Sequence, residues 1–115
     1  EITGVFKIPC RIEKKGIITV RDNSTATNLY YIIRESVNNA IRHGKPSEIY
    51  IRLIESKRRL TATVENDGIV VKKKTQDKGM GLMIMRYRTH LMRGEFEAFP
   101  LEKGFMVRVV IPDIY

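Results

Sequence analysis

The stretch RESVNNAIRHG, residues 34–44, decides how the rest of the chain is interpreted. Glu35, Asn39 and His43 stand four residues apart within it. Each step of four residues turns an α-helix by about 40°, so these side chains form one slowly turning polar stripe. Such a stripe can line a cleft beside the core, or it can be the solvated face of an amphipathic helix. Taken alone, the segment favours the solvated face.

The helix that carries this stripe is predicted by the apolar residues around it. Their spacings of three and four are the period of a helix with one buried face. This apolar face consists of Leu29, Ile32, Ile33, Val37, Ala40 and Ile41. Asp22 and the polar residues after it can cap the start of the helix. We expect the helix to end after His43, with Gly44 in left-handed geometry and Pro46 confirming the stop.

Alternation of apolar and polar residues predicts strands on both sides of this helix. The expected strands form three pairs: residues 5–8 with 17–20, 49–53 with 60–64, and 95–99 with 105–111. A loop over residues 68–81 precedes a second helix over residues 82–92, which Gly94 closes. We therefore expect an α+β fold, a two-layer sandwich with helices on one face of a mixed, mostly antiparallel sheet.

Length and composition limit the class of protein. The chain has 115 residues, of which 43% are hydrophobic and 30% are charged, as expected for a single globular domain over residues 1–115. No apolar run approaches the roughly 20 residues that cross a bilayer. Cys10 is the only cysteine, so no internal disulfide can form and a reduced cytosolic setting is expected. The net charge of +8 attracts polyanions such as nucleic acids, nucleotide phosphates or acidic proteins.

The polar stripe offers groups suited to a metal ion and phosphates. The Asn39 carbonyl is a hard oxygen ligand of the kind that Mg²⁺ accepts, and Mg²⁺ takes few protein ligands. The Glu35 carboxylate can hold a metal-bound water or act as a base. Arg42 and His43 can donate hydrogen bonds to phosphate oxygens.

Asn66-Asp67-Gly68 follows the strand expected at residues 60–64. Continued alternation points Asn66 into the core, where an inward amide at a strand end can read the edge of a planar base. The alternative interpretation is an ordinary Asp-Gly turn. Alone, this motif is a weak indication of a binding site.

The segment KGMGL, residues 78–82, runs a Gly-x-Gly directly into the second expected helix. Gly79 and Gly81 allow backbone N–H groups to approach phosphates, and the N-terminus of a helix favours negative charge. Lys78 and the lysines at 72–74 could neutralise a triphosphate, or they could be the solvated side chains of a surface loop. A lone Gly-x-Gly is weak evidence for a phosphate site.

The order and spacing of these motifs resemble those of the Bergerat-type ATPases. That superfamily includes gyrase, a heat-shock chaperone, mismatch-repair ATPases and histidine kinases. Within it the chain resembles the ATP-binding catalytic domain of sensor histidine kinases with a short ATP lid. Residues 34–44 are similar to the N box of that family, residues 78–94 to its second glycine box and following helix, and residues 107–112 to its closing strand. The resemblance covers almost the whole chain.

The resemblance implies a role for each motif. Asn39 would ligate Mg²⁺, and Glu35 would organise the metal-bound water or the incoming histidine as the catalytic residue. The ATP-binding residues would be Asn39, Arg42 and His43 near the phosphates, Asn66 and Gly68 at adenine, and Lys78, Gly79, Met80, Gly81 and Leu82 in the lid hinge. His90 is interpreted as structural or exposed, since that family carries its phosphorylated histidine in a separate domain.

Three positions depart from the family pattern. Asn66 stands where the family has Asp, Val70 where it has a second glycine, and Phe105 where it has a threonine. Each change removes a feature that supports nucleotide binding, so weak binding of ATP is expected. The same departures favour a second hypothesis, a degenerate nucleotide-binding or regulatory module without turnover.

The resemblance implies a fragment of a longer, homodimeric kinase. It would transfer the γ-phosphoryl group of Mg-ATP to a histidine on its own dimerisation domain, which is absent here, and a response regulator would be the next partner. The domain would be cytoplasmic, alone or as the cytosolic part of a membrane-anchored kinase. An anti-sigma-type serine kinase shares the fold and is a third hypothesis. A basic nucleic-acid-binding domain is a fourth, but no recognised nucleic-acid motif occurs, so no nucleic-acid partner is expected.

Overall fold

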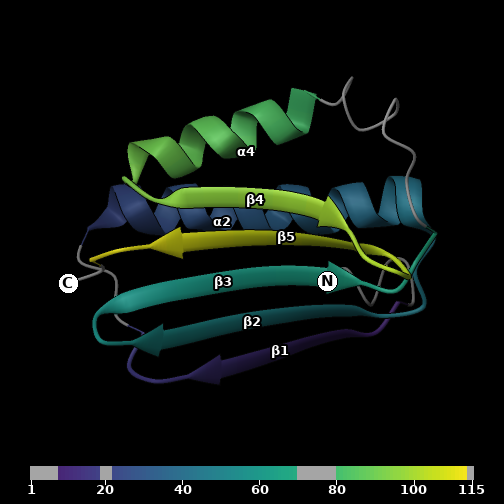
Figure 1. The fold of residues 1–115 in the computed structure, drawn as a ribbon, viewed down its shortest axis with the longest axis horizontal. Coiled ribbons are helices and arrows are strands. Elements are labelled where there is room, and N and C mark those ends of the chain that lie inside the picture. Colours follow the sequence, from purple (N-terminus) through teal and green to yellow (C-terminus); the bar gives the residue numbers. More distant parts are fainter. Residues whose placement is uncertain (1–7, 19–21, 70–79, 114–115) are drawn as a thin grey trace.

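The computed structural model describes residues 8–18, 22–69 and 80–113. In these residues a five-stranded sheet is covered on one face by helices (Figure 1). The strands lie in the order β1-β2-β3-β5-β4, with β1 at Cys10–Lys15, β2 at Ile49–Ser56, β3 at Arg59–Asn66, β4 at Glu95–Pro100 and β5 at Phe105–Ile111. β1 pairs parallel with β2, and the other neighbours pair antiparallel. The predicted two-layer α+β fold with a mixed, mostly antiparallel sheet is confirmed.

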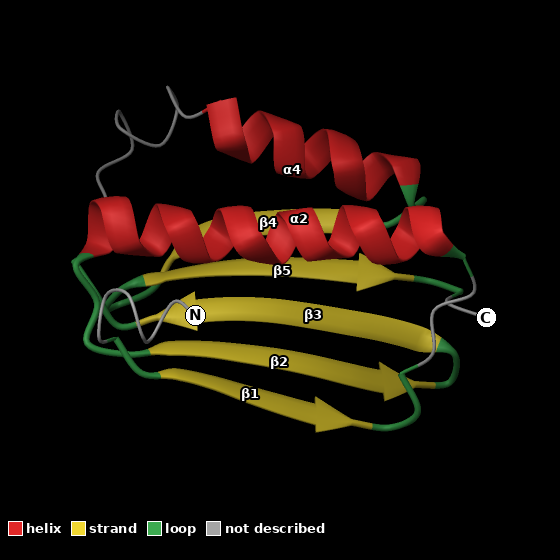
Figure 2. Cartoon of the chain, turned by 180° about the vertical axis from the view of Figure 1, so that it is seen from behind, coloured by secondary structure: helices red, strands yellow, loops and turns green. Residues whose placement is uncertain are grey.

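The long helix α2 spans Asn23–Asn39 and continues into a π-helical turn, η1, at Ala40–Gly44. It begins where the side chain of Asp22 accepts a hydrogen bond from the N–H of Thr25 at 2.7 Å, which satisfies a donor that the first turn leaves unpaired. The second helix, α4, spans Met80–Leu91. Figure 2 shows α2 lying along the sheet, with α4 beside it.

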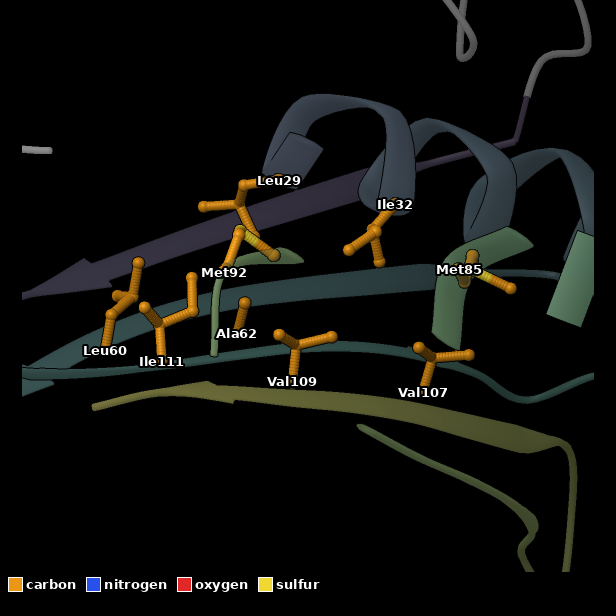
Figure 3. Packing of buried hydrophobic residues seen from close by; sticks show 9 residues of the cluster. All are labelled: Leu29, Ile32, Leu60, Ala62, Met85, Met92, Val107, Val109 and Ile111. Atoms are coloured by element: carbon orange, nitrogen blue, oxygen red, sulfur yellow. The ribbon is translucent and has the colours of Figure 1, made fainter. Parts of the chain in front are cut away.

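The hydrophobic core lies between the sheet and these helices. α2 contributes the fully or nearly buried Leu29, Ile32 and Val37, η1 contributes Ala40, and α4 contributes Met85. Figure 3 shows Leu29, Ile32 and Met85 above the alternate side chains of the strands; those strand residues are Leu60, Ala62, Val107, Val109 and Ile111. The apolar face predicted for the first helix is confirmed, since its other members, Ile33 and Ile41, are half-buried.

The first strand does not lie where alternation placed it. Residues 17 and 18 are not in a strand, residue 8 precedes one, and residues 5–7 and 19–20 lie outside the described residues. The strand is instead Cys10–Lys15, between the two expected segments. Its charged side chains are paired across β1 and β2, because Glu13 accepts a hydrogen bond from the hydroxyl of Tyr50 and forms an ion pair with Arg52. Pairing with β2 fixes this edge strand, and its own sequence lacks an apolar face.

The predicted role of Gly44 as a left-handed helix end is wrong. The residue with left-handed geometry is Lys45, which follows Gly44 and has φ 45°. After α4 the left-handed residue is likewise not the glycine but Arg93, which precedes Gly94 and has φ 59°. Gly94 is required by close packing, because a Cβ there would lie 2.6 Å from the carbonyl oxygen of Val110. The second helix also starts earlier than expected, at Met80.

Candidate functional site

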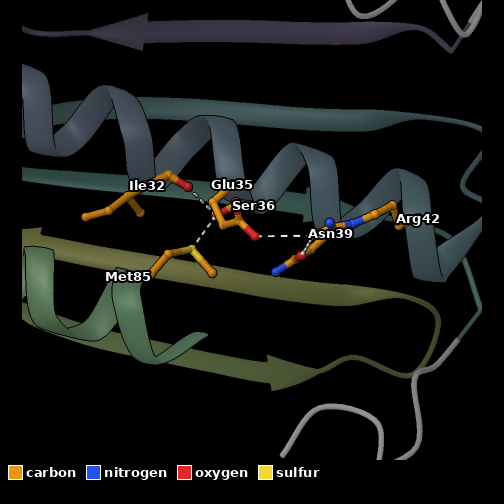
Figure 4. Close-up of polar contacts among 6 residues, drawn as sticks. All are labelled: Ile32, Glu35, Ser36, Asn39, Arg42 and Met85. Carbon is orange, nitrogen blue, oxygen red and sulfur yellow. Dashed lines mark hydrogen bonds and ion pairs between the residues drawn. The ribbon is translucent and has the colours of Figure 1, made fainter. Parts of the chain in front are cut away.

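The polar stripe of α2 is gathered around one guanidinium group. Nη2 of Arg42 donates to Oε2 of Glu35 at 3.2 Å and to Oδ1 of Asn39 at 2.5 Å (Figure 4). Helical spacing brings these residues to one side of the helix, since they stand at positions i, i+4 and i+7. The result is one positive charge held by a carboxylate and an amide oxygen at the end of α2. We call Glu35, Asn39 and Arg42 the Arg42 cluster.

The start of α4 lies directly against this cluster. A Cβ placed on Gly81 would come 2.5 Å from Oε2 of Glu35. The glycine motif and the polar stripe, which are far apart in sequence, therefore meet in space. A carboxylate beside the first turn of a helix is also favoured by the partial positive charge of that helix end.

A buried serine sets the spacing between the two helices beneath the cluster. Oγ of Ser36 donates a hydrogen bond to the carbonyl of Ile32 at 2.8 Å and lies 3.3 Å from the sulfur of Met85 (Figure 4). Nearer the other end of α2, Arg88 donates to Oδ1 of Asn28 at 2.8 Å. Sequence reasoning missed Ser36 and Arg88. The only sequence signal for Ser36 was a polar residue among the apolar positions of the helix.

The end of β3 is closed by backbone contacts. Asn66 is only 7% exposed, and its Oδ1 accepts the N–H of Gly68 at 2.8 Å. The N–H of Ile69 donates to the carbonyl of Gly44 at 2.6 Å, which ties the chain after β3 to the end of η1. The predicted inward orientation of Asn66 is confirmed, while its role in reading a base stays a prediction.

Two glycines make this junction possible. A Cβ on Gly68 would lie 2.1 Å from the carbonyl oxygen of Gly44. Gly104 has φ +98°, and a Cβ there would lie 1.8 Å from the backbone oxygen of Asn66. No other residue type leaves room for the neighbouring backbone at these positions. We call Gly44, Asn66, Gly68 and Gly104 the β3 junction.

Asp67 anchors the β3 junction to the start of β2. Its Oδ1 accepts the N–H groups of Ser47 at 2.9 Å and Glu48 at 3.0 Å, and its Oδ2 accepts the Ser47 hydroxyl. The hydrogen bond from the Ser47 side chain, supported by the two backbone N–H groups, lowers the pKa of the Asp67 carboxyl. These bonds stabilise the charged form of the carboxylate. The Asp-Gly turn seen in the sequence is therefore a specific anchor, which sequence reasoning missed.

The remaining predicted site residues fall into three groups. His43 is exposed on η1, and Arg42 is the residue that contacts Glu35 and Asn39. Leu82 packs on the hydrophobic core. Lys78 and Gly79 lie outside the described residues, as do Val70 and the side chain of Met80.

Two of the other residues singled out by sequence have clear positions. Phe105 pairs with Asn66 across β3 and β5 and is half-buried against the core, so it lies beside the β3 junction. His90 is exposed on α4, as expected.

The oxygens of the Arg42 cluster fit a hard divalent cation that takes most of its ligands from water and phosphates. Within the described residues no group of three or more His, Cys, Asp or Glu could hold a metal. Mg²⁺ does not need such a group, because it binds through one or two protein oxygens together with water and phosphates. The guanidinium between Glu35 and Asn39 shows that a positive charge is already stabilised at this place.

The outer side of α4 carries apolar side chains that the domain itself does not cover. Met83, Ile84, Tyr87 and Leu91 are between 48% and 70% exposed, and their spacing places them on one side of the helix. We call these four residues the α4 stripe. The described part of α4 contains arginines but no acidic residue. Over the residues that the structure describes, no helix combines the length and the apolar character needed to cross a membrane.

Two solved structures with this arrangement are histidine kinase domains. The histidine kinase domain of the blue-light-activated kinase from Erythrobacter litoralis superimposes with a TM-score of 0.75 and 19% identity, over 96% of this chain and 59% of that chain. The catalytic domain of the histidine kinase ThkA gives a TM-score of 0.76 and 18% identity, over 97% of this chain and 84% of that chain. At this identity the likeness shows the fold. The class of protein is an ATPase domain of the Bergerat fold.

The chain belongs to the family of histidine kinase-, DNA gyrase B- and HSP90-like ATPases, which matches residues 24–114. Similar curated proteins are sensor kinases. Sensor histidine kinase YdfH of Bacillus subtilis is 32% identical over 98 residues, which are 81% of this chain and 24% of that protein. Nitrate/nitrite sensor protein NarX of Escherichia coli is 25% identical over 105 residues, 90% of this chain and 18% of that protein. The chain thus spans about a fifth of these relatives and is the ATP-binding domain of the sensor-histidine-kinase type.

Proposed function

We propose that this domain binds Mg-ATP and donates the γ-phosphoryl group to a histidine on a separate dimerisation domain of a longer, homodimeric kinase. A response regulator is then the next acceptor in two-component signalling. The observation that carries the proposal is the meeting of Glu35 and Asn39 with the start of α4 at Gly81. It unites an acidic group, a hard oxygen ligand and a helix N-terminus at one place, as phosphoryl transfer from a nucleotide requires.

The residues of the Arg42 cluster have distinct roles in this proposal. Asn39 holds Mg²⁺ through Oδ1, and Mg²⁺ when bound neutralises charge on the triphosphate. Glu35 accepts a hydrogen bond from one ring nitrogen of the incoming histidine or holds a metal-bound water, which orients the attacking group. The attacking nitrogen forms a bond to the γ-phosphorus, the bond to the bridging oxygen breaks, and ADP leaves with its electron pair. Arg42 and His43 donate to phosphate oxygens.

We assign binding of the adenine base to the β3 junction. Asn66 and Gly68 lie at the end of β3, and Phe105 lies beside Asn66 on the neighbouring strand. The adenine ring would contact this rigid end of the sheet while its phosphates extend toward Asn39. Gly81, at the start of α4, leaves room there for the Glu35 carboxylate.

The α4 stripe is the surface that we assign to the histidine-bearing domain. It starts two residues after Gly81, which touches Glu35, so a helix seated on it brings its own side chains close to the carboxylate. The four exposed apolar side chains supply burial, and the basic α4 suits a partner with acidic residues at its rim. We place the domain in the cytoplasm, alone or as the cytosolic part of a membrane-anchored kinase, because ATP and a free Cys10 thiol suit that compartment.

Nucleotide titration of the isolated domain tests the binding step. Calorimetry with Mg-ATP and Mg-ADP should show binding that weakens when Mg²⁺ is omitted. Asn39→Ala should remove this dependence on Mg²⁺ while leaving the fold intact, since Asn39 is half-exposed at the helix end. Asn38→Ala, one position earlier, is the matched control. Equal dependence on Mg²⁺ in Asn39→Ala and the parent would show that Asn39 is no ligand.

Radiolabelled ATP tests the transfer step. The isolated domain should gain no acid-labile phosphate, whereas the full-length protein should gain it on a histidine outside this chain. Ile84→Asp in the full-length protein should reduce labelling at least tenfold without changing nucleotide affinity, because it charges the α4 stripe. Label on His43 or His90 of the isolated domain would contradict the assignment of the acceptor.

A nucleotide-binding module without turnover is the second candidate. Asn66 in place of an acidic residue and Phe105 in place of a threonine favour it, since both remove polar contacts expected at the base. The same labelling experiment separates the candidates. A full-length protein that binds Mg-ATP but acquires no phosphohistidine is a regulatory module.

A further inference from the structure

Arg42 occupies the oxygens that the proposed function assigns to the metal. Its Nη2 lies 2.5 Å from Oδ1 of Asn39 and 3.2 Å from Oε2 of Glu35. An amide oxygen has two lone pairs, and a hydrogen bond this short takes up one of them. A divalent cation bound to the same oxygen would also stand next to a fixed positive charge, which repels it. The guanidinium and the metal therefore compete for this place, and the repulsion between their charges disfavours binding of both.

The guanidinium is held weakly enough to be exchanged. The side chain of Arg42 is 59% exposed in this ion pair, so water screens its attraction to Glu35. Exposed ion pairs of this kind contribute little to stability. Arg42 also lies in the last turn of η1, at the C-terminal end of the α2–η1 helix. Its release costs little when a stronger anion becomes available.

We infer that Arg42 is an internal substitute for the metal, which keeps divalent cations out of the site until a nucleotide arrives. This inference rests on the proposed function. Phosphate oxygens attract a guanidinium more strongly than the Glu35 carboxylate does, because they carry more charge and accept paired hydrogen bonds. When phosphates take Arg42, Asn39 and Glu35 are released for the metal that the nucleotide carries. The metal thus enters with the nucleotide and does not enter alone.

The inference predicts opposite effects of one substitution on two ligands. Removing the charge of Arg42 frees the Asn39 oxygen, so a divalent cation alone should bind more tightly. The same change removes a phosphate contact, so the metal–nucleotide complex should bind more weakly. A residue that served only to stabilise the helix would not shift these two affinities in opposite directions.

Mn²⁺ is a suitable probe, because it shares the oxygen ligands of Mg²⁺ and its free concentration is measured by electron paramagnetic resonance. Arg42→Gln should bind Mn²⁺ at least tenfold more tightly than the parent in the absence of nucleotide, and should bind Mn-ADP at least fivefold more weakly. Arg34→Gln is the matched control, because Arg34 is exposed on the same helix and its guanidinium lies over the ring of Tyr31. This control should change neither affinity.

A second variant tests whether the tighter binding of Mn²⁺ comes from the Asn39 oxygen. Asn39→Ala combined with Arg42→Gln should lose the tighter Mn²⁺ binding, since no released amide oxygen remains. Unchanged Mn²⁺ affinity in Arg42→Gln would overturn the inference, and so would an equal gain in Arg34→Gln or in the double variant. Failure of the parent to bind Mn-ADP would instead overturn the proposed function, whatever Arg42→Gln does with Mn²⁺ alone.

Discussion

The two ends of the candidate site are built by different means. The β3 junction is closed by backbone atoms that leave no room for a Cβ at Gly68 or Gly104. The Arg42 cluster is held by the exposed side chain of Arg42 and the half-buried side chains of Glu35 and Asn39 at the end of a helix. A surface fixed by backbone packing cannot rearrange without disturbing the sheet, whereas exposed hydrogen bonds exchange at little cost. The comparison indicates that the β3 junction is a rigid end suited to a flat base. The Arg42 cluster is an exchangeable end, whose hydrogen bonds can be replaced by those of charged ligands.

The largest expected effect is on the rigid end. Gly104→Ala should lower the free energy of unfolding by about 3 kcal/mol or more, since it combines an unfavourable positive φ with a backbone clash. Urea denaturation measures this loss. Lys103→Ala, at the exposed neighbouring position, should stay within about 0.5 kcal/mol of the parent. Equal stability of the two variants would show that the backbone of the β3 junction can move to make room for the added methyl group.

A smaller effect is expected at the base. Asn66→Asp should tighten ATP binding by roughly five- to tenfold, because a charged acceptor gains about 1 kcal/mol over a neutral one. Oδ1 of residue 66 would still accept the N–H of Gly68, and the second oxygen would replace an NH₂ donor. The variant should also discriminate more strongly against GTP. If titrations of both nucleotides show no gain for ATP, residue 66 does not face the base.

Asp67 tests whether the rigid end depends on charge. The lowered pKa of Asp67 means that its contribution to stability is complete above the unfolded pKa of about 3.9 and is lost as the pH falls through the lower folded value. Asp67→Asn should cost about 1 kcal/mol at pH 7, and this difference should shrink below about pH 4. Denaturation at both pH values measures it. A difference that does not change with pH would assign the effect to shape rather than charge.

The smallest effect on stability is expected at the exchangeable end. Gly81→Ala adds a methyl group whose nearest neighbours are Oε2, Cδ and Cγ of the Glu35 side chain, which can move, and alanine favours a helix over glycine by about 1 kcal/mol. Its free energy of unfolding should equal or slightly exceed that of the parent. Phosphoryl transfer in the full-length protein should nevertheless fall, because the Glu35 carboxylate is displaced. A loss of stability like that of Gly104→Ala would remove the distinction between the two ends.

Local periodicity predicted most of the fold. The apolar face around Ile32 and Val37, the hairpin of β2 and β3, and the inward Asn66 each follow from neighbours within a few residues. The edge strand β1 could not be found in this way, because its six residues lack an apolar face and are fixed by pairing with β2. The position of the charged Glu13 in this strand is explained only by its contacts with Tyr50 and Arg52.

The sequence by itself determined every described element except β1, the family resemblance and the identity of the polar residues near the site. Tertiary structure alone decided that Gly81 lies against Glu35, that Arg42 rather than His43 holds Asn39, and that the β3 junction is sealed by backbone contacts. The physical reason is the short range in sequence over which periodic patterns carry information. Helical and strand periods record which side a residue faces, but contacts between distant elements depend on how whole helices and strands pack, and no local pattern encodes those distances.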